Sequence, residues 1–243
     1  MNCLVWNCRG AIGHNFPSLI RDYTRIYHID FLAILETCIN GNADEKVIKK
    51  FGMDNCVRVD AIGFSGGIWH LWRSNCPPIT VISTSHHCIH LKINGNSSSA
   101  CCLSIVYASP QLRHKENTRE ELRHLKDSLN IPWCIAGDFN IVLFGHEKID
   151  GAPVNQSSCN AFLNCINDCK LVDLGCSGPE FTCSRGNLRE RLDRVLISTS
   201  WKTLFPNSSV THLSISLYDH CGLWLRLRPN HHGARNNFKF LCP

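Results

Sequence analysis

Short apolar runs alternate with amphipathic segments along most of the chain, and this alternation predicts an α/β protein. The runs have the length and side-chain types of strands; they lie at 3–6, 30–36, 56–61, 68–73, 79–84, 88–93, 101–107, 131–137, 180–184, 190–198 and 221–228. Segments with apolar residues three or four positions apart predict helices; they lie at 16–29, 43–51, 118–129 and 159–171.

The order of these elements predicts one domain with a largely antiparallel core. No helix interrupts the five runs between 56 and 107, so they are expected to be antiparallel neighbours. Thr118 and Glu121 have the spacing of a capping box, which places the start of the third helix near Thr118. No repeat or linker divides residues 1–228, whereas 229–243 is expected to be a loose tail.

The run IPWCIAGDFN (131–140) ends in residues that are poor strand formers. Asp138 and Asn140 are two positions apart, so in a strand their side chains would point to one face. They would lie at the carboxyl end of the strand, where α/β sheets tend to bind ligands. A carboxylate beside an amide suits chemistry on water, metal or phosphate. The alternative interpretation is a helix cap or a turn, in which Asp and Asn are common.

Other polar residues recur next to strand-like runs. Each has an ordinary explanation by itself, as a cap, a loop start or a core phenol with its hydroxyl at the surface. Together, carboxylates, amides, a phenol and a histidine predict a catalytic site. The candidate residues are Asn7, Glu36, Tyr107, Asp138, Asn140, Asp193, Asp219 and His220.

Composition agrees with a packed globular domain, since 44% of the residues are hydrophobic and 19% are charged. No apolar run approaches the length of a membrane span, and the start of the chain lacks the layout of a signal peptide. An intracellular protein without membrane association is therefore expected. No obligate protein partner is evident from the sequence.

The net charge of +5 is a mild bias towards anionic partners. Charged residues concentrate at 113–126, where the signs are mixed, and at 184–194, which contains four arginines. Three of these, Arg185, Arg189 and Arg191, are candidates for binding nucleic acid. The second concentration predicts either a phosphate-binding groove or simply a solvated face.

The sixteen cysteines favour neither a zinc site nor a disulfide framework. No two of them have the Cys-x-x-Cys spacing typical of zinc ligands, and disulfide frameworks belong mainly to small secreted chains. Cys3, Cys101, Cys134 and Cys165 lie inside apolar runs. Free cysteine behaves there as a small hydrophobic residue.

Eight short motifs occur in the order found in the endonuclease/exonuclease/phosphatase superfamily; they are WNCRG, LAILET, SGGIWHLW, VYASP, GDFN, FT, RLDRVL and YDHCGLWL. More narrowly, the chain resembles the N-terminal endonuclease domain of plant LINE-type retrotransposon polyproteins, because EKIDGAP, LVDLG and FPNSSVTHL are also similar. The ordered set covers about residues 1–228. The resemblance implies a four-layer α/β sandwich, in which two mixed, mostly antiparallel sheets pack face to face with helices outside.

The resemblance also implies phosphodiester cleavage that depends on Mg²⁺, with Mn²⁺ as a substitute, by one metal ion or two. The implied function is DNA nicking by a retrotransposon endonuclease, with the nucleus as its location. Glu36 would bind the metal with Asn7 alongside, and Asp219 would belong to the same cluster. These types suit the task because oxygen ligands hold a hard cation, which offsets the charge of the phosphate.

The implied catalytic residues divide the remaining tasks among them. Asp138 would orient or deprotonate the attacking water, while Asn140 would bind the scissile phosphate or that water. Tyr107 would contact a phosphate oxygen. Asp193 would orient His220, which as an imidazolium stabilises charge on the phosphate.

The chain departs from the superfamily pattern at two of the motifs. Tyr218 stands where a serine is usual. In a strand its ring would share a face with His220 and would impair the site by crowding the imidazole; the alternative is that the ring turns to solvent and leaves His220 untouched. Cys183 replaces the usual tryptophan after Phe-Thr. Two rival interpretations follow: a phosphatase or deadenylase of the same superfamily, and a non-catalytic remnant that keeps the fold and binds nucleic acid.

Overall fold

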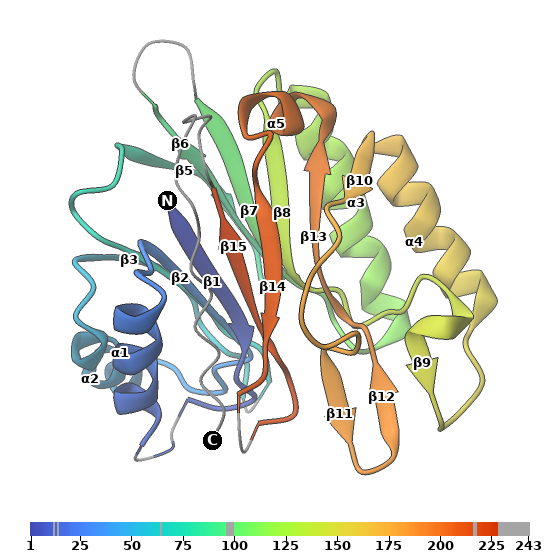
Figure 1. The fold of residues 1–243 in the computed structure, drawn as a ribbon, viewed down its shortest axis with the longest axis horizontal. Coiled ribbons are helices and arrows are strands. Elements are labelled where there is room, and N and C mark those ends of the chain that lie inside the picture. The colour runs from blue at the N-terminus through green and yellow to red at the C-terminus, as the bar shows by residue number, and fades with distance from the viewer. Residues whose placement is uncertain (12, 14, 64, 96–99, 216–217, 228–243) are drawn as a thin grey trace.

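Two six-stranded sheets face each other, and helices cover the outer face of each sheet (Figure 1). The computed structural model describes residues 1–227 apart from 12, 14, 64, 96–99 and 216–217. The expected four-layer α/β sandwich is confirmed. The predicted loose tail over 229–243 lies outside the described residues. No helix among the described residues is both long and apolar enough to cross a membrane.

The first sheet has the strand order β14–β15–β1–β2–β4–β3. β1 and β2 run parallel, and the other neighbours run antiparallel. The strands are β1 (Asn2–Asn7), β2 (Phe31–Leu35), β3 (Asn55–Val59), β4 (Ile68–Trp72), β14 (Ser209–Leu213) and β15 (Gly222–Arg226).

The second sheet has the strand order β10–β13–β8–β7–β6–β5, with a parallel pair formed by β7 and β8. Its strands are β5 (Ile79–Thr84), β6 (Cys88–Ile93), β7 (Cys101–Tyr107), β8 (Trp133–Asp138), β10 (Leu171–Asp173) and β13 (Asp193–Ser198). A small third sheet consists of β9 (Lys148–Ile149), β11 (Cys183–Arg185) and β12 (Leu188–Glu190).

The helices divide between the two outer layers (Figure 1). Those on the first sheet are α1 (Phe16–Ile26), α2 (Asn42–Ile48) and the 3-10 turn η1 (Lys49–Phe51). Those on the second sheet are α3 (Leu112–Ser128) and α4 (Gln156–Asp168). The remaining short elements are α5 (Thr199–Leu204) and η3 (Gly145–Glu147).

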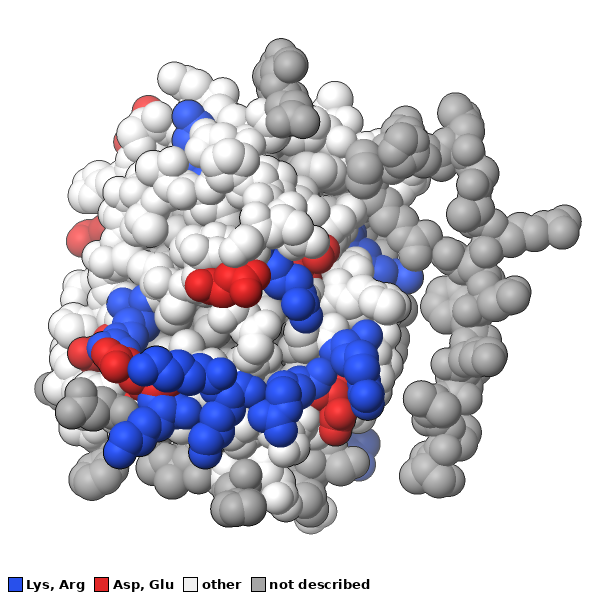
Figure 2. All heavy atoms as spheres, turned by 90° about the vertical axis from the view of Figure 1, so that its left-hand side faces the viewer, with Lys and Arg blue, Asp and Glu red and all other residues white. Residues whose placement is uncertain are grey.

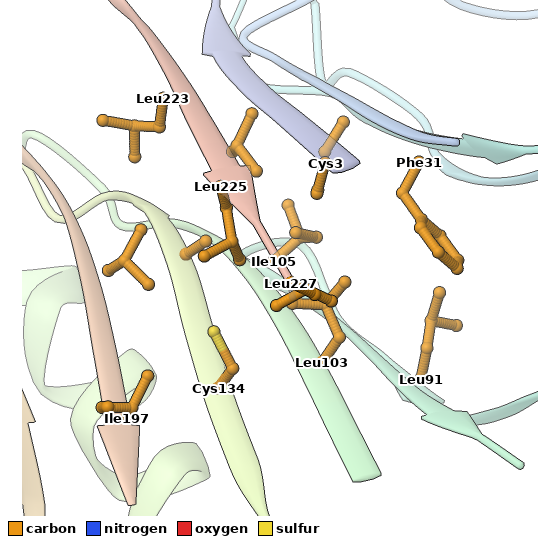
Figure 3. Close-up of a cluster of buried hydrophobic side chains, with 14 of the residues drawn as sticks. Cys3, Phe31, Leu91, Leu103, Ile105, Cys134, Ile197, Leu223, Leu225 and Leu227 are labelled. Atoms are coloured by element: carbon orange, nitrogen blue, oxygen red, sulfur yellow. The ribbon is translucent and has the colours of Figure 1, made fainter. Parts of the chain in front are cut away.

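The main core lies between the two sheets, where alternate residues of facing strands meet (Figure 3). Phe31 and Leu225 of the first sheet pack in one cluster with Leu103 and Ile197 of the second. The cysteines of the described part are all free thiols. Those expected to act as small hydrophobic residues are buried; they are Cys3, Cys101, Cys134 and Cys165.

Two expectations about neighbouring elements are wrong. The five runs between 56 and 107 are not one antiparallel series, because β3 and β4 join the first sheet while β5, β6 and β7 join the second. The third helix begins at Leu112, six residues before the expected start. Thr118 is buried within it, and Glu121 bonds to His90 and Ser85 rather than capping the helix.

Gly137 is required where β8 approaches β7. It lies opposite Val106 in the parallel ladder, and its φ is +152°. A Cβ atom at this position would lie 1.9 Å from the carbonyl oxygen of Val106, so the two strands would have to separate. Because Asp138 follows directly, this contact also determines where its carboxylate lies.

We expect Gly137→Ala to destabilise the protein by several kcal/mol, since the added methyl group meets backbone that cannot rotate away. Gly145→Ala is the matched control, because a Cβ atom there meets nothing within 4 Å. Urea unfolding of both variants measures the difference. Equal midpoints for the two variants would show that β7 and β8 tolerate the separation.

His70 is buried between the two sheets without a hydrogen bond. Its side chain is fully buried beside Phe31 and Trp72, and neither ring nitrogen has a partner among the described residues. Burial therefore lowers the pKa of His70 to about 3. The folded protein holds this ring neutral, whereas the unfolded chain binds a proton below about pH 6.5.

This difference predicts acid lability. The stability that depends on neutral His70 is present above pH 6.5 and is lost as the pH falls towards 3. Between pH 7 and pH 5 the loss is about 2 kcal/mol in the free energy of unfolding. His70→Leu should remove this part of the pH dependence, and His124→Leu at an exposed position should not. Urea titrations at both pH values test this; identical losses in the two variants would contradict it.

Candidate active site

Three candidate residues form one row across the second sheet. Tyr107 ends β7 and pairs with Asp138 at the end of β8, and Asp138 pairs in turn with Asp193 at the start of β13. Neighbours in a sheet project to the same face, so the phenol and two carboxylates are adjacent. All three side chains are buried, with at most 4% of each residue exposed.

Two further candidates reach the same place from the first sheet. Asn7 ends β1, and Glu36 follows the last residue of β2. The amide nitrogen Nδ2 of Asn7 donates to Oε2 of Glu36 (3.0 Å) and to Oδ2 of Asp138 (2.8 Å). Asn7 therefore links the metal-binding candidate to the candidate base across the two sheets.

His220 is held by contacts on both its side chain and its backbone. Nδ1 lies 2.9 Å from Oδ2 of Asp193, and Trp6 donates its indole N–H to the carbonyl oxygen of His220 (3.1 Å). Burial favours the neutral ring, but the charge and hydrogen bond of Asp193 outweigh this and raise the pKa of His220. The imidazole is therefore charged at neutral pH, with its proton at Nδ1 directed to Asp193.

Asn140 reaches the site through a turn rather than through strand alternation. β8 ends at Asp138, and Asn140 has a left-handed φ of +50°. Its backbone N–H donates to Oδ1 of Asp138 (2.7 Å), and its amide donates to Oδ2 (3.2 Å) and to the carbonyl of Ala108 (2.8 Å). The expected shared strand face is wrong, but the expected proximity of the two side chains is correct. Phe139 points away and packs on Phe162.

The pKa of the Asp138 carboxyl group is raised towards neutral pH. Complete burial raises its pKa to about 7, and the charge of Asp193 contributes in the same direction. The imidazolium of His220 and the hydrogen bond from Asn7 oppose this rise. A carboxylate with this pKa can accept a proton from water near neutral pH.

Thr182 is a positioning residue to which the sequence analysis assigned no role. Its Oγ1 accepts hydrogen bonds from the backbone N–H groups of Leu192 and Asp193, both at 3.0 Å. Its carbonyl accepts from the N–H of Cys221, and Cys183 forms a bridge with His220. In the sequence, Thr182 is marked only by the Phe-Thr motif. Through these contacts, Thr182 holds the strand that begins at Asp193 beside the segment that carries His220.

Asp219 lies at the rim and is neutralised by arginines. Its Oδ2 lies 2.7 Å from Nη1 of Arg9 and 3.3 Å from Nε of Arg185. Burial would raise the pKa of Asp219, but the hydrogen bond from Arg9 lowers it. Nε of Arg9 also lies 3.6 Å from Oε2 of Glu36. The guanidinium of Arg9 thus stands between two of the expected metal-binding carboxylates.

The donor set fits a hard divalent cation. Glu36 and Asp219 offer partly exposed carboxylate oxygens, and Asn7 offers an amide oxygen. That Arg9 lies between the two carboxylates shows that this position favours positive charge. Asp138, Asp193 and His220 form a second group of side chains whose potential metal-binding atoms lie close together. In this group, His220 is hydrogen-bonded to Asp193, and Asp193 is paired with Asp138 in the sheet.

A groove of about 530 Å³ opens beside the site and carries four basic side chains in its lining. Lys115 of α3 is buried and donates from Nζ to the carbonyl of Asn140. Arg9, Lys148 and Arg185 belong to the same lining. The sequence alone does not mark Lys115 or Lys148 as groove residues, because their elements meet this groove only in the folded chain.

The three arginine candidates do not lie together. Arg185 is at the groove, and Arg189 is exposed on β12. Arg191 was expected with them, but its guanidinium binds Glu147 (2.9 Å) and Asp173 (2.9 Å). Arg194, which is fully buried, binds the same two carboxylates. This ion cluster attaches the segment after β8 to β13.

Tyr218 does not crowd the imidazole as expected. Residues 218–220 do not form a strand, so the assumed shared face with His220 is absent. The ring packs edge-on against Trp6, with centroids 4.7 Å apart, and lies 6.4 Å from the ring of Phe16. It thus joins the apolar cluster beneath α1, on the outer face of the first sheet.

The geometry agrees with comparison to known proteins. The sequence pattern described as the Endonuclease/Exonuclease/phosphatase family matches residues 4–214. The chain belongs to this family. Its members are hydrolases that act on phosphodiester bonds, and the nucleases among them depend on divalent metal. No curated protein matches the chain.

Solved structures of family enzymes share the fold at low identity. The AP endonuclease LMAP from Leishmania major is 16% identical, with a TM-score of 0.74, and the match covers 94% of this chain and 88% of that one. The 3′ phosphatase NExo from Neisseria, bound to a product DNA hairpin, is 16% identical (TM-score 0.72; 94% and 99% covered). The endonuclease domain of TRAS1, a telomere-specific non-LTR retrotransposon, is 12% identical (TM-score 0.72; 94% and 98% covered).

The position of Tyr218 predicts a cost in stability rather than in activity. Tyr218→Ser should lower the free energy of unfolding by about 1–3 kcal/mol, because it removes a half-buried ring and its contact with Trp6. Tyr218→Phe should retain most of that stability. Phosphodiester cleavage well below the melting temperature should be equal in all three proteins. Faster cleavage by the serine variant at unchanged stability would restore the crowding hypothesis.

Proposed function

We propose that this chain is a Mg²⁺-dependent phosphodiesterase that nicks DNA, as the endonuclease domain of a LINE-type retrotransposon does. The observation that supports it most is the buried arrangement of Asp138, Asp193 and His220 beside a groove lined by lysine and arginine. Basic side chains along the groove can attract an anionic backbone and place one phosphate beside the buried Asp138, Asp193 and His220.

The attacking water would be activated by Asp138. Its carboxylate is held by hydrogen bonds from Asn7 and Asn140, so it has little freedom to rotate away from the phosphate. With its raised pKa it takes the proton of water as the water oxygen approaches phosphorus. The amide group of Asn140 donates to Asp138 and to the carbonyl oxygen of Ala108, so its Oδ1 would be the atom that accepts a hydrogen bond from this water.

The charge that develops on the phosphate would be stabilised by His220 and Tyr107. Asp193 keeps His220 as an imidazolium, whose Nε2 proton is available to a phosphate oxygen. Burial raises the pKa of the Tyr107 phenol, as do the neighbouring carboxylates Glu36 and Asp138, so its hydroxyl stays protonated. It can donate a hydrogen bond to a second oxygen.

Glu36, Asn7 and Asp219 would hold the cation. When bound, Mg²⁺ supplies positive charge that offsets the phosphate and the developing alkoxide. Arg9 lies between the two carboxylates in this structure. If a cation took that place, the guanidinium of Arg9 could pair with the DNA backbone, together with Arg185 and Arg189.

The experiment is nicking of supercoiled plasmid with Mg²⁺ and with EDTA. Asp138→Asn and His220→Gln should each lower the rate by at least about a hundredfold, since each removes an acid–base or electrostatic group. Glu120→Gln, an exposed carboxylate on α3, is the matched control and should cut normally.

The rival functions give different results in the same preparations. A phosphatase would release inorganic phosphate from a duplex with a 3′-phosphate end and leave the plasmid intact. A non-catalytic remnant would bind plasmid without cutting it under any metal condition. Nicking that persists unchanged in both site variants would mean that the activity does not come from this site.

A further inference from the structure

The outer helical layer of the first sheet carries a row of basic side chains (Figure 2). α1, α2 and η1 contain five lysines and arginines against three carboxylates, of which Asp44 is buried. The basic residues on these helices are Arg21, Arg25, Lys46, Lys49 and Lys50, and all five are exposed.

The opposite helical layer differs in its balance of charge. α3 and α4 together contain five basic and five acidic residues. Their charges also pair with one another: Arg119 binds Glu116, and Arg123 binds Glu116 (3.1 Å) and Asp168 (2.9 Å). Surplus positive charge is therefore a property of one helical layer and does not follow simply from the net charge of the chain.

Two ion pairs involve side chains of this layer within the described part of the chain. Arg25 pairs with Asp22 (3.2 Å) on α1, and Arg58 of β3 pairs with Glu45 (3.7 Å) of α2. Four other cations have no ion pair within the described part of the chain; they are Arg21, Lys46, Lys49 and Lys50, and we call them the basic row.

The basic row spans two helices whose relative position is fixed. Nη1 of Arg21 donates to the carbonyl oxygen of Lys50 (2.8 Å), and Nη2 donates to Oγ of Ser18 (2.9 Å). These bonds hold the guanidinium on α1 close to η1. The guanidinium of Arg21 is therefore already ordered in the free protein, so part of the entropy cost of binding a phosphate there is already met.

We propose that the basic row binds the phosphate backbone of a second nucleic-acid segment, distinct from the one in the catalytic groove. The groove cations Lys115 and Lys148 belong to α3 and β9, whereas the basic row lies on the outer face of the first sheet. Exposed cations without acidic partners suit the phosphate backbone of a duplex, which carries a dense line of negative charge. The choice of nucleic acid as the polyanion rests on the proposed function.

An anionic membrane surface fits the basic row less well. Membrane-binding helices combine a basic face with several apolar side chains that enter the lipid. Among the described residues of α1, α2 and η1, only one large hydrophobic side chain is exposed, that of Ile26. A surface that offers charge without apolar side chains suits a nucleic-acid backbone better than a lipid surface.

The test compares two variants with the same loss of charge. Lys46→Gln/Lys49→Gln/Lys50→Gln alters the basic row. Lys126→Gln/Lys170→Gln/Lys202→Gln alters α3, the turn after α4, and α5, all outside the basic row. Binding of a 12-base-pair duplex is measured by titration calorimetry at low salt, with Ca²⁺ in place of Mg²⁺. The parent and the control should bind two duplexes, and the basic-row variant should bind one.

Salt dependence gives a second readout on a longer duplex. Loss of three lysine–phosphate contacts should lower the slope of log affinity against log salt by about three, while the control changes it little. Plasmid nicking at saturating DNA should be the same in all three proteins. Vesicles containing phosphatidylserine are titrated in parallel.

Each outcome bears on the proposal separately from the nuclease. Equal stoichiometry and equal slopes in the two variants would overturn it, even if the plasmid is nicked. Loss of vesicle binding with unchanged DNA binding would also overturn it, in favour of a membrane surface. If no protein nicks the plasmid but the basic-row variant alone binds one duplex fewer, the proposed catalytic function is wrong and nucleic-acid binding by the basic row is supported.

Discussion

Two hydrogen bonds between the sheets determine the geometry of the site. Asn7, at the end of β1, donates to Asp138, at the end of β8, and His220, just before β15, bonds to Asp193, at the start of β13. Each joins the first sheet or its flanking loop to the second sheet. Both bonds are buried, so removing one partner would leave the other polar group buried without a hydrogen bond. For a charged group, this would lower the free energy of unfolding by about 3–5 kcal/mol.

The surrounding structure limits how far these bonds can shift. Gly137 lets β8 lie against β7 immediately before Asp138, and Thr182 binds the backbone of Asp193. Trp6 holds the carbonyl of His220 from the other side. Its ring packs on the outer face of β1 against Tyr218, while the next side chain, Asn7, points into the site. The outer apolar cluster therefore supports the candidate catalytic residues from the face of the first sheet that points away from them.

Most helices and strands were predictable from local patterns, but part of the strand pairing was not. Periodicity located most strands, but it could not show that the chain crosses between sheets after β4, because β4 and β5 are both apolar runs bounded by turns. β14 was not predicted as a strand; its sequence, SVTHL, is short and partly polar. The third helix was started too late because Thr118 and Glu121 resemble a cap in sequence and serve tertiary contacts in the fold.

The candidate site residues were chosen chiefly from the order of the motifs, and the contacts in the fold corrected how some of them are positioned. Asn140 lies beside Asp138 because of a left-handed turn, which no alternation rule describes. Tyr218 was assigned to the wrong face because its segment was assumed to be a strand. Lys115 is separated from Asn140 by 25 residues, so only the packing of α3 against β8 brings it to the groove.

We propose that Asp193 and His220 act as one unit across the two sheets. A double-mutant cycle on the rate of plasmid nicking tests it, with Asp193→Asn, His220→Gln and the combined variant. If the pair is one unit, the combined variant should be about as slow as the slower single variant, because the second change removes nothing further. If the two losses multiply instead, the residues contribute independently and the account is contradicted.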